Sequence, residues 1–150
     1  MQTKIVIPAF ATILLIVIAG YFLFNPSYEK SIQAKYYYET GEYKEAYTLA
    51  KEAFSLDLYN RMASTIMAQS KTSLKYVSYV EDSRKYIKQI DEIASNDIIS
   101  DANKAKMKII CEIMINRYIK LAPSVITDND LVQDSAKYNS MFEKLLEKVN

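Results

Sequence analysis

YYYETGEYKEAYTLAKEAFSLDLYN, residues 36–60, decides the fold class that this sequence predicts. It is interrupted by Gly41, one of only 2 glycines among the 150 residues of the chain. Glycine adopts positive φ without a steric clash, so it is typical of a helix end followed by a tight reversal. After it, Ala46, Ala50 and Ala53 recur at steps of three and four, which places them on one face of a helix. The stretch therefore predicts two helices that pack closely through small side chains.

The rest of the composition also favours helices. With 2 glycines and 3 prolines, the chain has too few turn residues for a sheet protein. Beyond residue 26, apolar periodicity predicts six helices in antiparallel pairs, at about 27–39, 43–56, 62–74, 77–93, 107–121 and 131–146. We expect Ser27 and Thr127-Asp128 to cap the first and last of these helices. Ser95 to Asp97 and Pro123 are expected to break the chain between helices.

IVIPAFATILLIVIAGYFLF, residues 5–24, contains no charged residue. At about 1.5 Å per residue such a helix is about 30 Å long, the thickness of the hydrocarbon core of a bilayer. We therefore expect residues 1–25 to be a transmembrane anchor and residues 26–150 to form a helical domain. A cleaved signal peptide and a buried core helix are the alternatives. The apolar run continues past the weak cleavage site at Val17–Ala19, and Thr12 is its one polar side chain.

The residues before this segment predict its orientation. Lys4 and the α-amino group are positive, and no acidic residue precedes the apolar run. The positive-inside rule places such an end in the cytoplasm. The sequence therefore predicts a single-pass inner-membrane protein with a cytoplasmic N-terminus and a periplasmic helical domain.

Residues 27–60 resemble a tetratricopeptide repeat (TPR), a helix–turn–helix unit of about 34 residues. The matching residues are Ala34, Tyr37, Gly41, Tyr43, Ala46, Ala50, Ala53, Leu56, Asp57 and Asn60. Lys30, Gln33 and Leu58 depart from the family pattern. A second, degraded unit begins at Arg61, with a turn expected near Lys75, and residues 98–150 match a third hairpin in length.

The resemblance implies a short α-solenoid whose concave groove binds a peptide or a helix of a partner protein. The groove would be lined by first-helix residues, namely Tyr28, Ser31, Lys35, Tyr38, Glu39, Met62, Thr65, Gln69 and Thr72. Tyrosine, of which the chain has 13, suits such a surface because it offers a large contact area at low entropic cost. The alternative is that several of these residues are ordinary solvated side chains.

Several kinds of chemistry are absent from the sequence. With no histidine and with Cys111 as the one cysteine, the chain lacks a Ser-His-Asp triad and the usual zinc ligand sets. Adjacent acids such as Glu81-Asp82 and Asp91-Glu92 point about 100° apart on a helix, and DNDLVQD (128–134) lacks the glycine of a calcium loop. With a net charge of +1, the chain lacks the excess of basic residues that is typical of nucleic-acid binding. We therefore expect no enzyme, no cofactor, no metal and no small-molecule substrate, and a buried thiol at Cys111.

Together these features predict a non-catalytic, membrane-anchored protein–protein interaction module. It would be a small scaffold or adaptor subunit of an envelope complex, such as a flagellar motor or a secretion or translocon machine. The alternative is a periplasmic, chaperone-like holdase that uses the same groove with loose specificity for exported proteins. An enzyme with an unrecognised carboxylate or tyrosine site would instead require a deep pocket with clustered acids.

Overall fold

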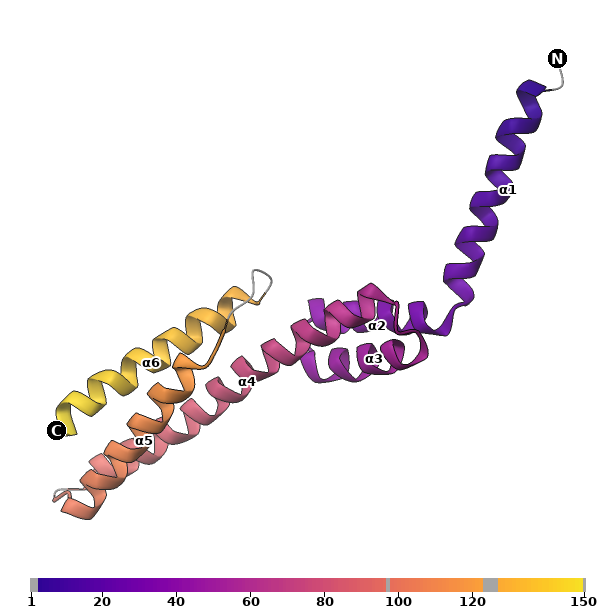
Figure 1. Cartoon of the computed structure of the whole chain (residues 1–150). Coiled ribbons are helices and arrows are strands. Elements are labelled where there is room, and N and C mark those ends of the chain that lie inside the picture. The colour runs from indigo at the N-terminus through magenta and orange to yellow at the C-terminus, as the bar shows by residue number, and fades with distance from the viewer. Residues whose placement is uncertain (1–2, 97, 123–126, 150) are drawn as a thin grey trace. The chain divides into compact units, whose positions relative to one another are not determined.

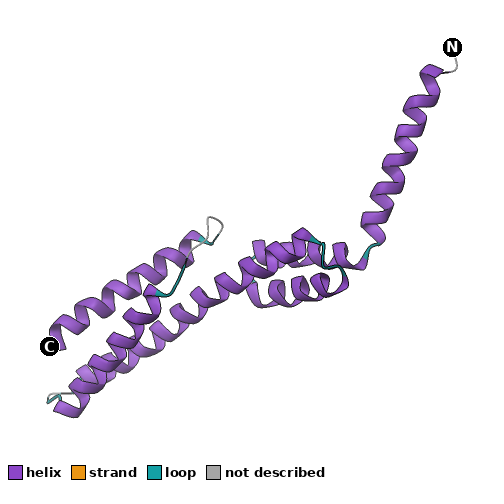
Figure 2. Cartoon of the chain, in the orientation of Figure 1, coloured by secondary structure: helices purple, strands orange, loops and turns teal. Residues whose placement is uncertain are grey.

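The computed structural model describes residues 3–96, 98–122 and 127–149, without the side chains of residues 3–6, 22 and 23. Within these ranges the chain forms six helices and no strand (Figures 1 and 2). The helices are α1 (Thr3–Phe24), α2 (Pro26–Glu39), α3 (Tyr43–Leu56), α4 (Arg61–Ala94), α5 (Asp101–Ile119) and α6 (Asn129–Val149). The all-α class predicted from the sequence is confirmed.

The chain divides into two compact units, which we call the N-terminal unit (Met1–Ser70) and the C-terminal unit (Lys71–Asn150). Their boundary lies within α4, so this helix contributes its first turns to one unit and its remaining turns to the other. Each unit has its own cluster of buried apolar side chains.

The start of α2 differs from the sequence expectation. Asn25, not Ser27, is the N-cap residue, and its side chain accepts a hydrogen bond from the backbone N–H of Ser27 at 3.0 Å. Pro26 follows as the first helical residue, where its fixed φ suits a helix and its missing N–H costs nothing. Ser27 is instead buried, and its hydroxyl donates to the carbonyl oxygen of Ala53 at 2.8 Å.

The turn after α2 is built as the sequence predicts. Gly41 has φ of 84°, a conformation that other residues adopt only with strain. The N–H of Glu42 donates to Tyr37 O at 2.8 Å and the N–H of Gly41 donates to Tyr38 O at 3.2 Å. These two bonds form a Schellman motif, which satisfies the last carbonyls of α2 and reverses the chain.

The N-terminal unit is held together by small side chains. Ala34 of α2, Ala46 and Ala50 of α3, and Ile66 of α4 form one buried cluster. Partly buried side chains surround it, namely Tyr37, Tyr38, Leu49 and Met67. Small side chains thus form the contact between these helices, as the spacing of the alanines predicts.

The third and fourth predicted helices are one helix. The turn expected near Lys75 is absent, because α4 continues without a break from Arg61 to Ala94. Neither glycine nor proline occurs in this segment, so nothing in the chain forces an end. Buried residues also continue at helical spacing through the expected turn, at Ser70, Ser73, Tyr76, Tyr79 and Val80. The second helical hairpin expected from Arg61 is therefore not formed.

The C-terminal unit combines the later turns of α4 with α5 and α6. Its buried cluster consists of Tyr79, Ile90, Met107, Ile110, Cys111, Met114 and Phe142. Cys111 is fully buried, as predicted. α5 is not buried on all sides, because Ile109 and Ile113 are 55% and 50% exposed.

The ends of the helices in this unit agree in part with the sequence. Asp128 caps α6, since its carboxylate accepts a hydrogen bond from Asp130 N at 2.9 Å. α4 ends at Ala94, next to the break predicted at Ser95 and Asn96. Asp97 and Pro123, which were expected to take part in the breaks, lie outside the described residues.

Among the side chains described in α1, bulky apolar groups are exposed around the helix. In the described part of the chain, no single helix has both the length and the hydropathy needed to cross a membrane. Two helical segments joined at a bend, Ile7–Tyr21 and Pro26–Glu39, together have the required length and composition.

Candidate protein-binding surface

The outward stripe of α2 contains much of the predicted groove. Lys35 and Glu39 are exposed and form an ion pair one helical turn apart, with 3.7 Å between Nζ and the carboxylate. Tyr28 is partly buried at the start of the same stripe. Tyr38 lies further inward, where its ring meets that of Tyr43 edge-on at a centroid distance of 5.4 Å. Tyr38 therefore stabilises the hairpin turn, in addition to any contact with a partner.

Ser31 does not line a solvent-facing groove. It is fully buried, and its hydroxyl donates to the carbonyl oxygen of Ser27 at 2.8 Å. The outward position is taken by Ile32, which is 57% exposed and was missed from the sequence. At 100° per residue, both Ser31 and Ile32 fall within about 60° of Tyr28 and Lys35, but Ser31 also falls within about 60° of the buried Ser27 and Ala34, whereas Ile32 lies at least about 140° from them. This arithmetic is the signal that identifies Ile32.

The predicted groove residues of α4 lie on one side of its first turns. Met62 and Thr65 are exposed and Gln69 is partly exposed. They adjoin the buried residues Ala63, Ile66 and Ser70, of which Ile66 packs with alanines of α2 and α3. Thr72, the last predicted groove residue, belongs to the C-terminal unit. We define the α2–α4 surface as the predicted residues that are exposed or partly exposed on this side, together with Ile32. Its members are Tyr28, Ile32, Lys35, Glu39, Met62, Thr65 and Gln69.

A buried amide fixes α4 beside α2. Asn60 is fully buried, and its Nδ2 donates to the hydroxyls of Ser27 and Ser31, both at 2.8 Å. Its Oδ1 accepts from the backbone N–H of Ala63 at 3.1 Å, which caps the first turn of α4. Because the Ser27 hydroxyl also donates to α3, at Ala53 O, this Asn60 network connects α2, α3 and α4.

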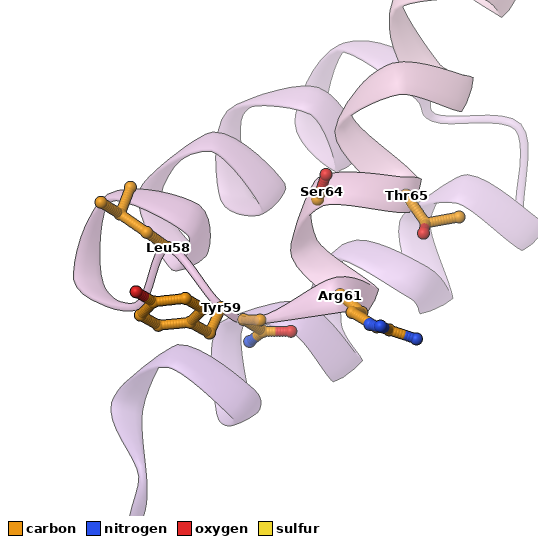
Figure 3. Close-up of a pocket in the computed structure, with 6 residues that line it drawn as sticks. Leu58, Tyr59, Arg61, Ser64 and Thr65 are labelled. Carbon is orange, nitrogen blue, oxygen red and sulfur yellow. The ribbon is translucent and has the colours of Figure 1, made fainter.

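An open pocket of about 310 Å³ borders the α2–α4 surface at Thr65 (Figure 3). Its other lining residues come from the α3–α4 connection and the first turns of α4, namely Leu58, Tyr59, Asn60, Arg61 and Ser64. Asp57 holds the connection in a tight turn by accepting a hydrogen bond from Tyr59 N at 2.9 Å. The described lining contains one cation and no acid, so this pocket is not the deep, acid-lined kind that an unrecognised enzyme would require.

A second pocket, of about 340 Å³, lies in the C-terminal unit between α4 and α6. It is lined by Arg84, Ile87, Lys88, Asp91, Lys137, Tyr138 and Met141. Arg84 donates to the hydroxyl of Tyr138 at 3.3 Å and lies 3.9 Å from the carboxylate of Asp134. This pocket could not be predicted from the sequence, because its two walls are more than 40 residues apart in the chain.

Several titratable groups of the C-terminal unit are buried in its core, paired in a salt bridge or exposed. Burial raises the pKa of Tyr79 to about 12 and also raises the pKa of the Cys111 thiol. Asp82 pairs with Arg117 at 2.8 Å, while the adjacent Glu81 is exposed, so these neighbouring acids do not converge. Across the residues that the structure describes, no group of three or more acidic or cysteine side chains is arranged to hold a metal ion.

Comparison of the chain with models of protein families, with curated proteins and with solved structures found no match. The function must therefore be inferred from the geometry of the chain itself.

Proposed function

We propose that this protein is a membrane-anchored, non-catalytic protein–protein interaction module, a small scaffold or adaptor subunit of an envelope complex. The observation that carries the proposal is the α2–α4 surface. The Asn60 network and the contact of Ile66 with the alanines hold α2 and α4 together, and each of these helices contributes an exposed stripe to the surface. The resemblance of residues 27–60 to a TPR supports the same interpretation, since first helices line the binding groove in that family.

The chemistry of the α2–α4 surface suits a helix or an extended peptide. Tyr28, Ile32 and Met62 supply apolar contact area of the kinds that contribute most at interfaces. Lys35, Glu39 and Gln69 surround them with groups that pair with either charge or with a peptide backbone. Because both helices are fixed by buried contacts before binding, little conformational entropy is lost when a partner binds.

The anchor in this proposal is α1. A helix with apolar side chains on all sides requires a core or a lipid environment, and those of Ile7, Phe10 and Leu15 are exposed. The polar side chain of Thr12 forms its hydrogen bond within α1, since its hydroxyl donates to Pro8 O at 2.8 Å. In the proposed orientation the N-terminus is cytoplasmic and the helical domain is periplasmic, where flagellar motors and secretion or translocon machines offer partners.

Membrane fractionation tests the anchor. We expect the full chain to remain with the membrane after alkaline carbonate extraction, and a variant lacking residues 1–24 to be recovered as soluble protein. Recovery of the full chain in the soluble fraction would contradict the anchor.

Photocrosslinking in native membranes tests the surface. A photoreactive residue at Ile32 should capture one or a few proteins, and Lys35→Glu should reduce that capture several-fold. Lys51→Glu, an equal charge change on the exposed side of α3, should leave it unchanged. Equal capture in both variants would place the interface elsewhere, and capture of many unrelated exported chains would favour the holdase.

A further inference from the structure

We propose that the α3–α4 connection, through Leu58 and Tyr59, is a second membrane contact that inserts into the headgroup layer of the bilayer that α1 enters. This inference rests on the proposed anchor. It assigns a lipid surface, and not a protein, as the occupant of this end of the N-terminal unit.

The position of the connection follows from hydrogen bonds and chain length. Tyr59 precedes Asn60, whose side chain is bonded to the hydroxyl of Ser27 at 2.8 Å. Ser27 follows Phe24, the last residue of α1, by only three residues, which span at most about 11 Å of chain. The connection therefore lies close to the end of α1 whatever direction α1 takes.

The side chains at this end of the hairpin are unusually exposed for their type. Leu58 is 68% exposed and Tyr59 is 91% exposed; Leu56, two residues before Leu58, is exposed, and so is Phe24 at the end of α1. Figure 3 shows Leu58 and Tyr59 projecting from the connection. The turn at the opposite end of the hairpin contains only Thr40, Gly41 and Glu42. The two ends of the α2–α3 hairpin therefore differ in hydropathy. The apolar end, which carries the α3–α4 connection, is the one beside α1.

The chemistry of the connection fits the headgroup layer. Tyrosine prefers this layer because its ring is apolar and its hydroxyl reaches water, and leucine adds apolar area towards the acyl chains. Arg61, at the first turn of α4, supplies a cation for lipid phosphate and a long aliphatic stem. Asp57 is held in the turn by the N–H of Tyr59, and Lys30 and Glu52 neutralise each other at 2.7 Å.

Single tryptophans test this contact, because the natural chain has none. The full chain would be made with Phe10→Trp, Tyr59→Trp or Tyr36→Trp. Each variant would be placed in phosphatidylcholine–phosphatidylglycerol vesicles with or without lipid brominated near the top of its acyl chains. Tyr36 is the matched control, an exposed tyrosine about 14 Å further along α2 from Ser27.

We expect brominated lipid to reduce the fluorescence of the variants at positions 10 and 59 at least twofold and to leave that at position 36 unchanged. Quenching at position 10 with none at position 59 would overturn this inference and leave the anchor standing. Quenching at position 36 equal to that at position 59 would overturn it as well, because the whole unit would then lie on the lipid. No quenching at position 10 would overturn the anchor, and this inference with it.

Discussion

At the scale of single residues, Asn60 connects the helices of the N-terminal unit through buried hydrogen bonds. Its amide donates to two hydroxyls of α2 and accepts from the first turn of α4, all out of contact with solvent. A buried polar group with all its hydrogen bonds formed specifies one arrangement, because any other arrangement leaves those groups without partners.

Asn60→Ala should therefore destabilise the protein by about 2 kcal/mol, through the lost helix cap and the lost bonds to Ser27 and Ser31. Urea unfolding of detergent-solubilised protein, followed by circular dichroism, measures this change. Asn116→Ala, on the exposed face of α5, should change the unfolding free energy by less than about 0.5 kcal/mol. Equal effects of the two changes would mean that the Asn60 network is not a stabilising contact.

Tyr79 predicts a pH dependence. Its pKa is raised to about 12 by burial, and a tyrosine in the unfolded chain titrates near 10. The folded state thus keeps a proton that the unfolded state loses between these values. The stabilisation is fully present below about pH 10 and is lost as the pH rises towards about 12.

Tyr79→Phe should accordingly reduce the alkaline loss of stability, which is measured as urea midpoints over a pH series. Tyr59→Phe, at a 91% exposed position, should retain the alkaline slope of the natural chain. If Tyr79→Phe retains that slope too, burial of Tyr79 is not its cause.

At the scale of elements, the need for glycine at position 41, in the reversal between α2 and α3, comes from backbone conformation. No atom lies within 4 Å of a Cβ added at Gly41, so a side chain there meets no steric contact and is opposed only by φ of 84°. The small residues that pack α3 against α2 come into contact only if the connection between the two helices is short. This packing therefore requires a tight turn.

Gly41→Ala should destabilise the hairpin by about 1 kcal/mol, and Gly41→Asn by less, because asparagine tolerates positive φ better. Gly20→Ala is the matched control, since Gly20 also has open space around it but lies within α1. Thermal unfolding of the three variants measures the difference. A stable Gly41→Ala variant would show that the turn does not need its left-handed residue.

α4 shows why elements were only partly predictable. The apolar residues of its first half are sparse, and the resemblance to a repeat led to an expected turn near Lys75. A turn needs a residue that stops the helix, and this segment has no glycine or proline to do so. The local sequence was thus more informative than the repeat pattern.

At the scale of the whole molecule, each unit has a separate buried cluster, and α4 supplies residues to both. Ile66 belongs to the cluster of the N-terminal unit, whereas Tyr79 and Ile90 belong to that of the C-terminal unit. Truncation of a core residue should therefore act first on the unit that contains it.

Phe142→Ala should destabilise the C-terminal unit by about 3 to 5 kcal/mol, because it leaves a cavity in the cluster around Cys111 and Met114. Hydrogen exchange read by mass spectrometry should show lost protection in α5 and α6, with α2 and α3 retaining theirs. Tyr36→Ala, at an exposed position, should alter neither unit. Equal loss of protection in α2 and α3 would mean that the protein unfolds as one cooperative unit.

The exposure of several residues of the candidate surface agrees with the sequence. Lys35, Glu39, Met62 and Thr65 are exposed as expected, because long polar side chains and residues at helix starts are seldom buried in a core. Ser31, which the resemblance placed in the groove, is buried and Ile32 is exposed, the opposite of what the hydropathy of these side chains prefers. The network that reverses this preference involves Asn60, 29 residues away from Ser31 in the chain.

The sequence by itself determined the all-α class, the turn at Gly41, the alanine face of α3 and the apolar character of α1. These are local properties, since φ preference, periodicity and hydropathy depend on neighbours along the chain. Only the tertiary structure decided that Asn60 joins three helices, that Ser31 is inside, and that the apolar α3–α4 connection lies beside the end of α1. The physical reason is that burial of a half-polar helix depends on which distant segment covers it, and residues 27 and 60 meet across 33 positions of sequence.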